Sequence, residues 1–172
     1  MKAFVKATPQ NLNTNYRTVA KLIWGITQED FWISHSDGDA AFNSLSSFAF
    51  SLFLSDFNKE WNYVNPRWNT SYVHVHKTND PNISAIFTEF DDELPINQKG
   101  FYNLVLYIAT KLDGLISEDN RISWISTEQF QNKHRDIMNL PFNLALQKSI
   151  EKGRIVLPIP EPNYDQLDYD IY

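Results

Sequence analysis

The chain has 172 residues, of which 42% are hydrophobic and 15% aromatic, and its formal net charge is −6. This length suits one domain around a single core, and this apolar content excludes a disordered chain, because burial can offset the entropy lost on ordering. The lysines and arginines are scattered, so the composition argues against nucleic-acid binding and favours a basic partner. The absence of cysteine excludes disulfides, zinc–thiolate sites and a cysteine nucleophile.

Neither end of the chain nor its interior carries an obvious membrane or export signal. The N-terminal stretch has a lysine but no apolar run of signal-peptide length. The most apolar run, residues 42–57, is interrupted by serines and an aspartate, and it is too short to span a membrane. We therefore expect a cytoplasmic protein without a membrane partner.

The first elements are a strand and a helix. Residues 2–7 alternate as a strand does, and the Thr8-Pro9 pair ends it. Asn13 or Thr14 can cap a helix that runs to about Gly25. Its predicted buried stripe is formed by Tyr16, Val19, Ala20 and Ile23. Residues 28–34 then suggest a short turn of helix.

Residues 42–57 fit two patterns. At helical spacing, the apolar residues form two stripes, which would make a helix buried nearly all round. At a period of two, Phe48, Phe50, Leu52 and Leu54 alternate with smaller residues, as in a strand. The length of the run favours the helix, and the strand is the alternative.

A loop and a hairpin follow. Residues 61–68 are aromatic and polar and contain Pro66, which is typical of a loop with anchored rings. Residues 71–77 and 83–90 are strand-like, and the turn-forming segment 78–82 joins them into a hairpin.

The C-terminal half is mainly helical. A stripe from Phe101 to Leu112 predicts a helix that closes at Gly114 in a left-handed cap. Residues 115–117 and 122–125 suggest a second hairpin, and helices are expected from Thr127 and from Pro141 to Ile150, with a short edge strand at 154–160. The predicted fold is a single α+β domain over residues 1–158, with antiparallel hairpins packed against several helices.

Residues 159–172 form an acidic tail that contains three tyrosines. Each tyrosine brings a large apolar ring with a polar end. We therefore predict that the tail packs either on its own domain or on a neighbouring chain. In the second case the protein would be a homo-oligomer.

Two histidines lie two residues apart in the first hairpin. On a strand, His74 and His76 point to the same face and can reach one metal ion, such as zinc. Glu89 on the partner strand, or Asp91, Asp92 or Glu93 just beyond it, would supply the third ligand of a hydrolytic site. In the alternative interpretation, these histidines belong to the polar face of a hairpin whose Val73 and Val75 face the core.

Two further histidines have weaker signals. His35, with Asp37 or Asp39 and a neighbouring serine, could form a catalytic group, but a capped loop explains the same residues. His134 shares a helix face with Phe130 and is interpreted as a packed histidine.

The predicted interaction surfaces are aromatic. Trp61, Tyr63, Arg67 and Trp68 combine rigid rings with an arginine, as interaction hot spots do, although these rings could instead fold back onto the core. The second predicted surface is the tail, with the binding residues Tyr164, Asp168 and Tyr169.

The segment "LYIATKLDGLISEDNRISWISTEQF" resembles a helix–strand–turn–strand–helix passage in some small bacterial immunity proteins of the polymorphic-toxin type. The resemblance is carried by Gly114, Ile116, Ser117, Asp119 and Trp124. It implies a protein that blocks a toxin and to which no catalytic residues are carried over, and the acidic charge of the chain suits a basic toxin. The favoured hypothesis is thus a non-catalytic, cofactor-free protein-binding protein, and the alternative is a metal-dependent hydrolase that uses His74 and His76.

Overall fold

The computed structural model describes residues 1–36, 47–64, 70–88 and 94–155. Its strands and helices, in chain order, are β1 (Lys2–Lys6), α1 (Tyr16–Trp24), β2 (Ile33–His35), β3 (Phe48–Phe53), the 3₁₀ helices Leu54–Asp56 and Lys59–Tyr63, β4 (Thr70–Lys77), β5 (Ile83–Phe87), α3 (Pro95–Lys111), β6 (Leu115–Ser117), α4 (Thr127–Met138) and α5 (Phe142–Gly153).

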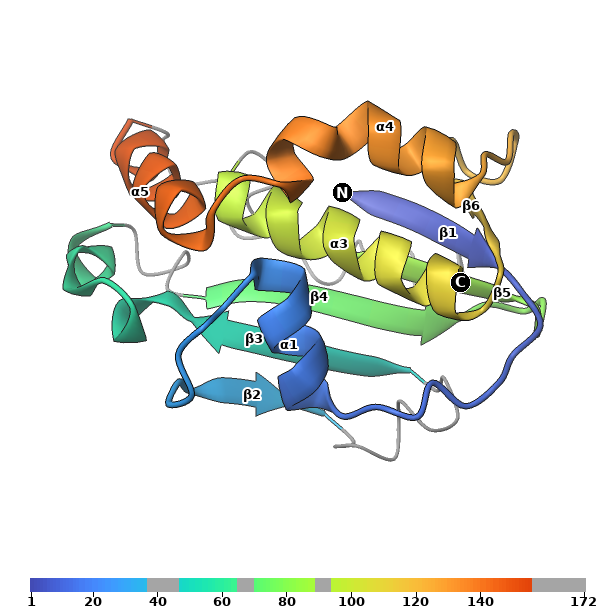
Figure 1. Ribbon diagram of the computed structural model, residues 1–172, viewed down its shortest axis with the longest axis horizontal. Helices are drawn as coiled ribbons and strands as arrows, with labels where there is room; N and C mark the ends of the chain where they lie inside the picture. The colour runs from blue at the N-terminus through green and yellow to red at the C-terminus, as the bar shows by residue number, and fades with distance from the viewer. Residues whose placement is uncertain (37–46, 65–69, 89–93, 156–172) are drawn as a thin grey trace, which may run out of the picture.

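The strands form one six-stranded sheet in the order β2-β3-β4-β5-β1-β6. Each neighbouring pair is antiparallel. Helices α1 and α3 lie across one face of the sheet, while α4 and α5 pack on α3 (Figure 1). The predicted α+β class and the single compact domain are confirmed.

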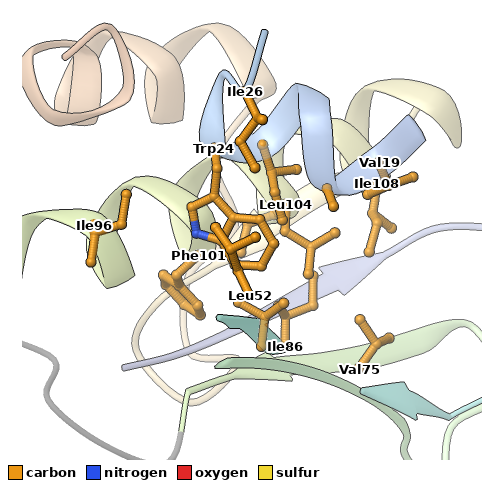
Figure 2. Packing of buried hydrophobic residues seen from close by; sticks show 14 of the residues in the cluster. Val19, Trp24, Ile26, Leu52, Val75, Ile86, Ile96, Phe101, Leu104 and Ile108 are labelled. Carbon is orange, nitrogen blue, oxygen red and sulfur yellow. The ribbon is translucent and has the colours of Figure 1, made fainter. Parts of the chain in front are cut away.

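The core lies between the sheet and the helices α1 and α3. Trp24 from α1 and Leu104 from α3 meet Leu52 and Ile86 from the sheet (Figure 2). The indole Nε1 of Trp24 donates a hydrogen bond of 3.1 Å to the buried hydroxyl of Ser71. Gly100 lets α3 approach that indole, because a Cβ at this position would clash with the Trp24 ring.

Local signals place the ends of two helices. The N-cap of α1 is Asn15, and not Asn13 or Thr14 as predicted, because it is the Asn15 side chain that accepts a hydrogen bond from the backbone of Thr18. Gly25 ends α1 with a φ of 75°, which glycine adopts without strain. Ser126 and Gln129 form a capping box at the start of α4. The predicted buried stripe of α1 is confirmed at Val19, Ala20 and Ile23.

The predicted helix at residues 42–57 is wrong over its described part, and the strand alternative is correct. Phe48–Phe53 is strand β3, followed by a 3₁₀ turn. Phe48 and Leu52 face the core, while Ala49 and Ser51 face away from it. The length of the apolar run favours a helix, but hydrogen bonding to β2 and β4 on both sides stabilises the strand instead. The helical turn predicted at 28–34 is also wrong, since Ile33–His35 forms β2.

The first hairpin, β4 and β5, is confirmed, but the second hairpin is reduced to one isolated bridge between Ile116 and Ile125. The residue with left-handed geometry after α3 is Asp113 (φ 50°) and not Gly114. Gly114 serves close packing instead, because a Cβ there would lie 3.0 Å from the carbonyl oxygen of Lys6. The edge strand predicted at 154–160 lies mostly outside the described residues.

Among the described residues, no helix is both long and apolar enough to cross a membrane.

Candidate functional site

The two faces of the sheet carry different side chains. We call the face that α1 and α3 leave uncovered the outer face. Because side chains alternate along a strand, the registers assign residues to each face. Those on the outer face of the three central strands are Lys2, Phe4 and Lys6 of β1, Tyr72, His74 and His76 of β4, and Ile83, Ala85 and Phe87 of β5.

His74 is the most enclosed histidine of the outer face, with 7% of its surface exposed. Its ring stacks on Phe87 at a centroid distance of 4.7 Å and an interplanar angle of 7°. The hydroxyl of Tyr72 lies 3.2 Å from its Nδ1. Burial, and to a smaller extent the charge of His76, lowers the pKa of His74 to about 3. The imidazole is therefore neutral at physiological pH.

The predicted pairing of His74 with His76 on one strand face is correct, and their ring centroids are 5.8 Å apart. Val73 and Val75 are fully buried on the opposite face, as the alternative interpretation requires. No group of three His, Cys, Asp or Glu side chains that could hold a metal occurs among the described residues. Glu89 and residues 91–93 lie outside them, so the zinc site stays a prediction.

Three cations gather around aromatic rings at the β1 side of the outer face. The ammonium of Lys2 and the guanidinium of Arg121 each lie 5.0 Å from the centroid of the Phe4 ring. The ammonium of Lys6 lies 5.7 Å from the Trp124 ring. Burial, followed by the charge of Arg121, lowers the pKa of Lys2. This cluster is a positive patch on a chain of net negative charge.

A second candidate surface lies at the β2 edge of the sheet. We call it the aromatic edge, and define it by Trp32, which precedes β2, and by Tyr63, which ends the 3₁₀ helix that begins at Lys59. Trp32 is 67% exposed and Tyr63 is 89% exposed, which is unusual for rings of this size. Next to Trp32 is a shallow cavity of about 470 Å³ that is wide open to solvent, and it is lined by Arg17, Asp30, Phe31, Trp32, Asp56 and Lys59.

Backbone and ring contacts hold Trp32 in place. Its backbone N–H donates a hydrogen bond of 2.9 Å to Oδ2 of Asp56. Its ring meets Phe53 edge-on at 6.4 Å. On the other side of the cavity, the guanidinium of Arg17 lies 4.7 Å from the Phe31 ring. The exposed indole is thus presented from a supported position, as interaction anchors are.

The predicted aromatic loop is corrected at one residue. Trp61 has no exposed surface and belongs to the core, so it is not available to a partner. The exposed aromatic residue of the same 3₁₀ helix is Tyr63. Arg67 and Trp68 lie outside the described residues, as do Tyr164, Asp168 and Tyr169 of the tail.

The remaining histidines have packing contacts. The ring of His35 lies 4.0 Å from that of Tyr16, and the acids predicted to assist it at positions 37 and 39 are outside the described residues. His134 stacks on Tyr102 at 3.8 Å, and its Nε2 lies 2.8 Å from Oε1 of Glu118. The interpretation of His134 as a packed histidine agrees with these contacts.

Sequence reasoning missed Trp32 and Arg121. The helical turn predicted at residues 28–34 does not single out Trp32, whereas a period-two pattern over residues 31–33 places it opposite the buried Phe31 and Ile33. Arg121 was placed in a turn, and no local signal connects it with Phe4, which is distant in sequence. Its φ of 71° and that of Asn120, 56°, direct this turn toward β1.

We found no match to this chain among protein-family models, curated proteins or solved structures. The candidate surfaces therefore rest on their own geometry and chemistry.

Proposed function

We propose that this protein acts by binding another protein, in the manner of a small immunity protein, and catalyses no reaction itself. The observation that carries the proposal is the exposure of Trp32 beside a cavity of about 470 Å³, together with a second exposed ring, Tyr63, in the 3₁₀ helix whose first residue, Lys59, lines that cavity. Large exposed rings leave apolar surface in water, and burying it against a partner is a main source of binding energy.

The cavity next to Trp32 has the mixed polarity of an interface rim. Asp30 and Asp56 offer carboxylates, while Arg17 and Lys59 offer cations. A side chain of the partner that enters this cavity can therefore form ion pairs while the rings exclude water around it. The net charge of −6 favours a partner with a basic surface, because opposite charges steer the encounter. A basic toxin is the partner that the immunity-type resemblance implies.

The test uses three proteins as bait in cells of the source organism: the unmodified chain, the Trp32→Ala/Tyr63→Ala variant, and an Ile122→Ala control. Ile122 is equally exposed but lies in the turn after β6, away from the aromatic edge. Each captured basic protein is then purified, and its affinity for all three baits is measured by calorimetry.

We expect a partner that binds the unmodified chain and the control with the same affinity. The double variant should weaken binding about 30-fold or more, which is the range for the loss of aromatic hot spots. Equal affinity for all three baits would exclude the aromatic edge as the binding surface. Co-expression of the partner then shows whether this chain relieves its toxicity.

A further inference from the structure

The two edges of the sheet differ in how their outward backbone groups are bonded. At one edge, β6 forms a bridge with Ile125: the N–H of Ile116 donates to the carbonyl of Ile125 at 3.0 Å, and the N–H of Ile125 donates back at 2.8 Å. The other edge is β2, which ends the strand order and pairs, among the described strands, with β3 alone (Figure 1). The β2 edge is therefore the one that can receive a further strand.

The hydrogen bonds between β2 and β3 show which groups of β2 point outward. The carbonyl of Trp32 accepts a bond of 3.4 Å from β3, and the N–H of Ser36 donates a bond of 2.9 Å to β3. Bonded and non-bonded residue pairs alternate in an antiparallel ladder, so Ser34 also bonds to β3, whereas Ile33 and His35 do not. The backbone N–H and C=O groups of Ile33 and His35 therefore point away from β3, toward the edge.

These outward groups form a row of two donors and two acceptors. Among the described residues, nothing bonds to the backbone of Ile33 or His35 from the edge side. The sequence of β2 contains no lysine and no proline, which are common means of protecting an edge strand. An extended peptide backbone has donors and acceptors at the matching spacing, so the chemistry of this edge is complementary to another strand.

The aromatic edge adds side-chain contacts beside this row. Trp32 immediately precedes β2, and its exposed ring shares a face with Ser34, opposite the buried Ile33. Facing residues of neighbouring strands have Cβ atoms about 5 Å apart, so an added strand would place one of its side chains against the Trp32 ring. An apolar side chain at that position would cover part of the ring and exclude water from it.

The charges beside Trp32 favour a basic residue in the added strand. The guanidinium of Arg17 is held by two backbone carbonyls. The carboxylate of Asp30 has no ion pair within the described part of the chain. Of the charged groups that line the cavity, two carboxylates, Asp30 and Asp56, thus face one cation that is not held by the backbone, Lys59. The net charge of −6 adds to this preference.

We propose that β2 is the docking edge for an extended segment of the protein partner, which adds to the sheet as a further strand. The proposal rests on the protein-binding function proposed above and specifies how the partner is held. Backbone hydrogen bonds to Ile33 and His35 align the segment, an apolar side chain covers Trp32, and a lysine or arginine pairs with Asp30.

A proline at position 35 tests the backbone bonds separately from the side chain. His35→Pro removes an outward N–H and leaves the bonds to β3 in place, because those come from Ser34 and Ser36. His35→Ala is the matched control. Both variants lose the imidazole and its ring contact with Tyr16 at 4.0 Å, but only the alanine variant keeps the N–H. Urea unfolding verifies that both variants are folded.

The probe is a phage-displayed library of random peptides of about 10 residues, which covers the usual length of a strand. The library is selected on the unmodified chain, and the affinities of synthesised peptides for the unmodified chain and both variants are measured by calorimetry. We expect peptides that bind His35→Ala within about twofold of the unmodified chain and bind His35→Pro about tenfold more weakly, because a hydrogen bond is lost and the proline ring blocks the edge.

Amide hydrogen exchange in the unmodified chain is a second measurement that depends on no variant. Peptide binding should slow the exchange of the Ile33 and His35 amides at least about tenfold. The amides of Ser34 and Ser36 already bond to β3 and should change little. A selection in which every peptide binds the proline and alanine variants equally would overturn the proposal, as would unchanged exchange at Ile33 and His35 in the complex.

Sedimentation of the unmodified chain alone tests whether the edge is occupied by a second copy. A dimer that His35→Pro abolishes and His35→Ala retains would overturn the proposal and assign the edge to β2 of another copy. Failure of the proposed function is a separate outcome. A natural partner that binds the Trp32→Ala/Tyr63→Ala variant at full affinity contradicts that function, whereas a partner that is sensitive to this double variant but binds both His35 variants equally contradicts only the docking edge.

Discussion

The two faces of the sheet differ in chemistry although the same strands build both. On the covered face, Val73, Val75 and Ile86 are fully buried under α1 and α3. One residue away along these strands, the outer face carries His74, Phe87 and the cations around Phe4. The covered face stabilises the fold through apolar burial, whereas the outer face combines a smaller buried cluster, Phe4, Ile83 and Ala85, with polar and charged groups.

The largest expected difference between the faces comes from two neighbouring residues of β5. Ile86→Ala should lower the free energy of unfolding by about 3–4 kcal/mol, since it leaves a cavity in the core. Phe87→Ala should cost less, about 1–2 kcal/mol, because the Phe87 ring is only half-buried; the variant loses the ring contacts with His74 and His76. Urea unfolding measures both. A larger loss for Phe87→Ala would show that the outer face carries the stability.

The closeness of packing on the covered face can be tested at Gly100. Gly100→Ala should lower the free energy of unfolding by about 3 kcal/mol, because the new methyl group meets the indole of Trp24 and disturbs its hydrogen bond to Ser71. Gly25→Ala is the control for backbone strain alone, and should cost about 1 kcal/mol at its positive φ. Denaturant unfolding with a Trp fluorescence signal compares the two variants. A cost for Gly100→Ala below that of the control would mean that α3 can move away from the ring.

The environment of His74 predicts a pH dependence specific to the outer face. Because its pKa falls from 6.5 in the unfolded chain to about 3 in the folded one, protonation favours the unfolded state. The stability from the neutral imidazole is present above pH 6.5 and is lost as the pH falls toward 3, by at most about 1.4 kcal/mol per pH unit.

His74→Leu removes this titration. The difference in unfolding free energy between the unmodified chain and the variant should therefore shrink as the pH falls from 6.5 to 4. Urea unfolding at several pH values measures this difference. A constant difference would mean that the pKa of His74 is the same in the folded and the unfolded chain.

The smallest expected effect concerns the cations of the outer face. Arg121→Gln should lower the free energy of unfolding by about 0.5–1 kcal/mol, the range for one cation–π contact with Phe4. Arg135→Gln on α4 is a control at an exposed position, where the guanidinium donates a hydrogen bond to Asn132, and it should cost less than about 0.5 kcal/mol. Thermal unfolding at low and high salt would detect both. Equal losses would show that the outer-face cations do not stabilise the domain.

Predictions from local sequence patterns are correct at the elements whose tertiary contacts favour the same structure. The strand at β1, the capped helix α1, the hairpin β4–β5 and the start of α4 each follow from local periodicity and from side chains that bond to nearby backbone groups. The same period of two correctly placed His74 and His76 on one face.

The errors occur where partners distant in sequence decide the outcome. Phe48–Phe53 is a strand because β2 and β4 provide hydrogen-bonding neighbours on both sides, although its composition also suits a buried helix. Trp61 is buried and Trp32 is exposed, while both stand in similarly aromatic stretches. Composition shows only that an aromatic ring is present; the residues that pack around it decide whether it is exposed to a partner or buried in the core.

The sequence by itself determined the class of the protein: one α+β domain, acidic, without thiol chemistry, with helices and strands at most of their observed places. These properties follow from residue types and from spacings within a few residues. Only the tertiary structure decided which rings are exposed, and that Lys2, Lys6 and Arg121 share one face. The physical reason is that such surfaces are assembled from strands and turns far apart in the chain, whose register is set by the packing of the whole sheet.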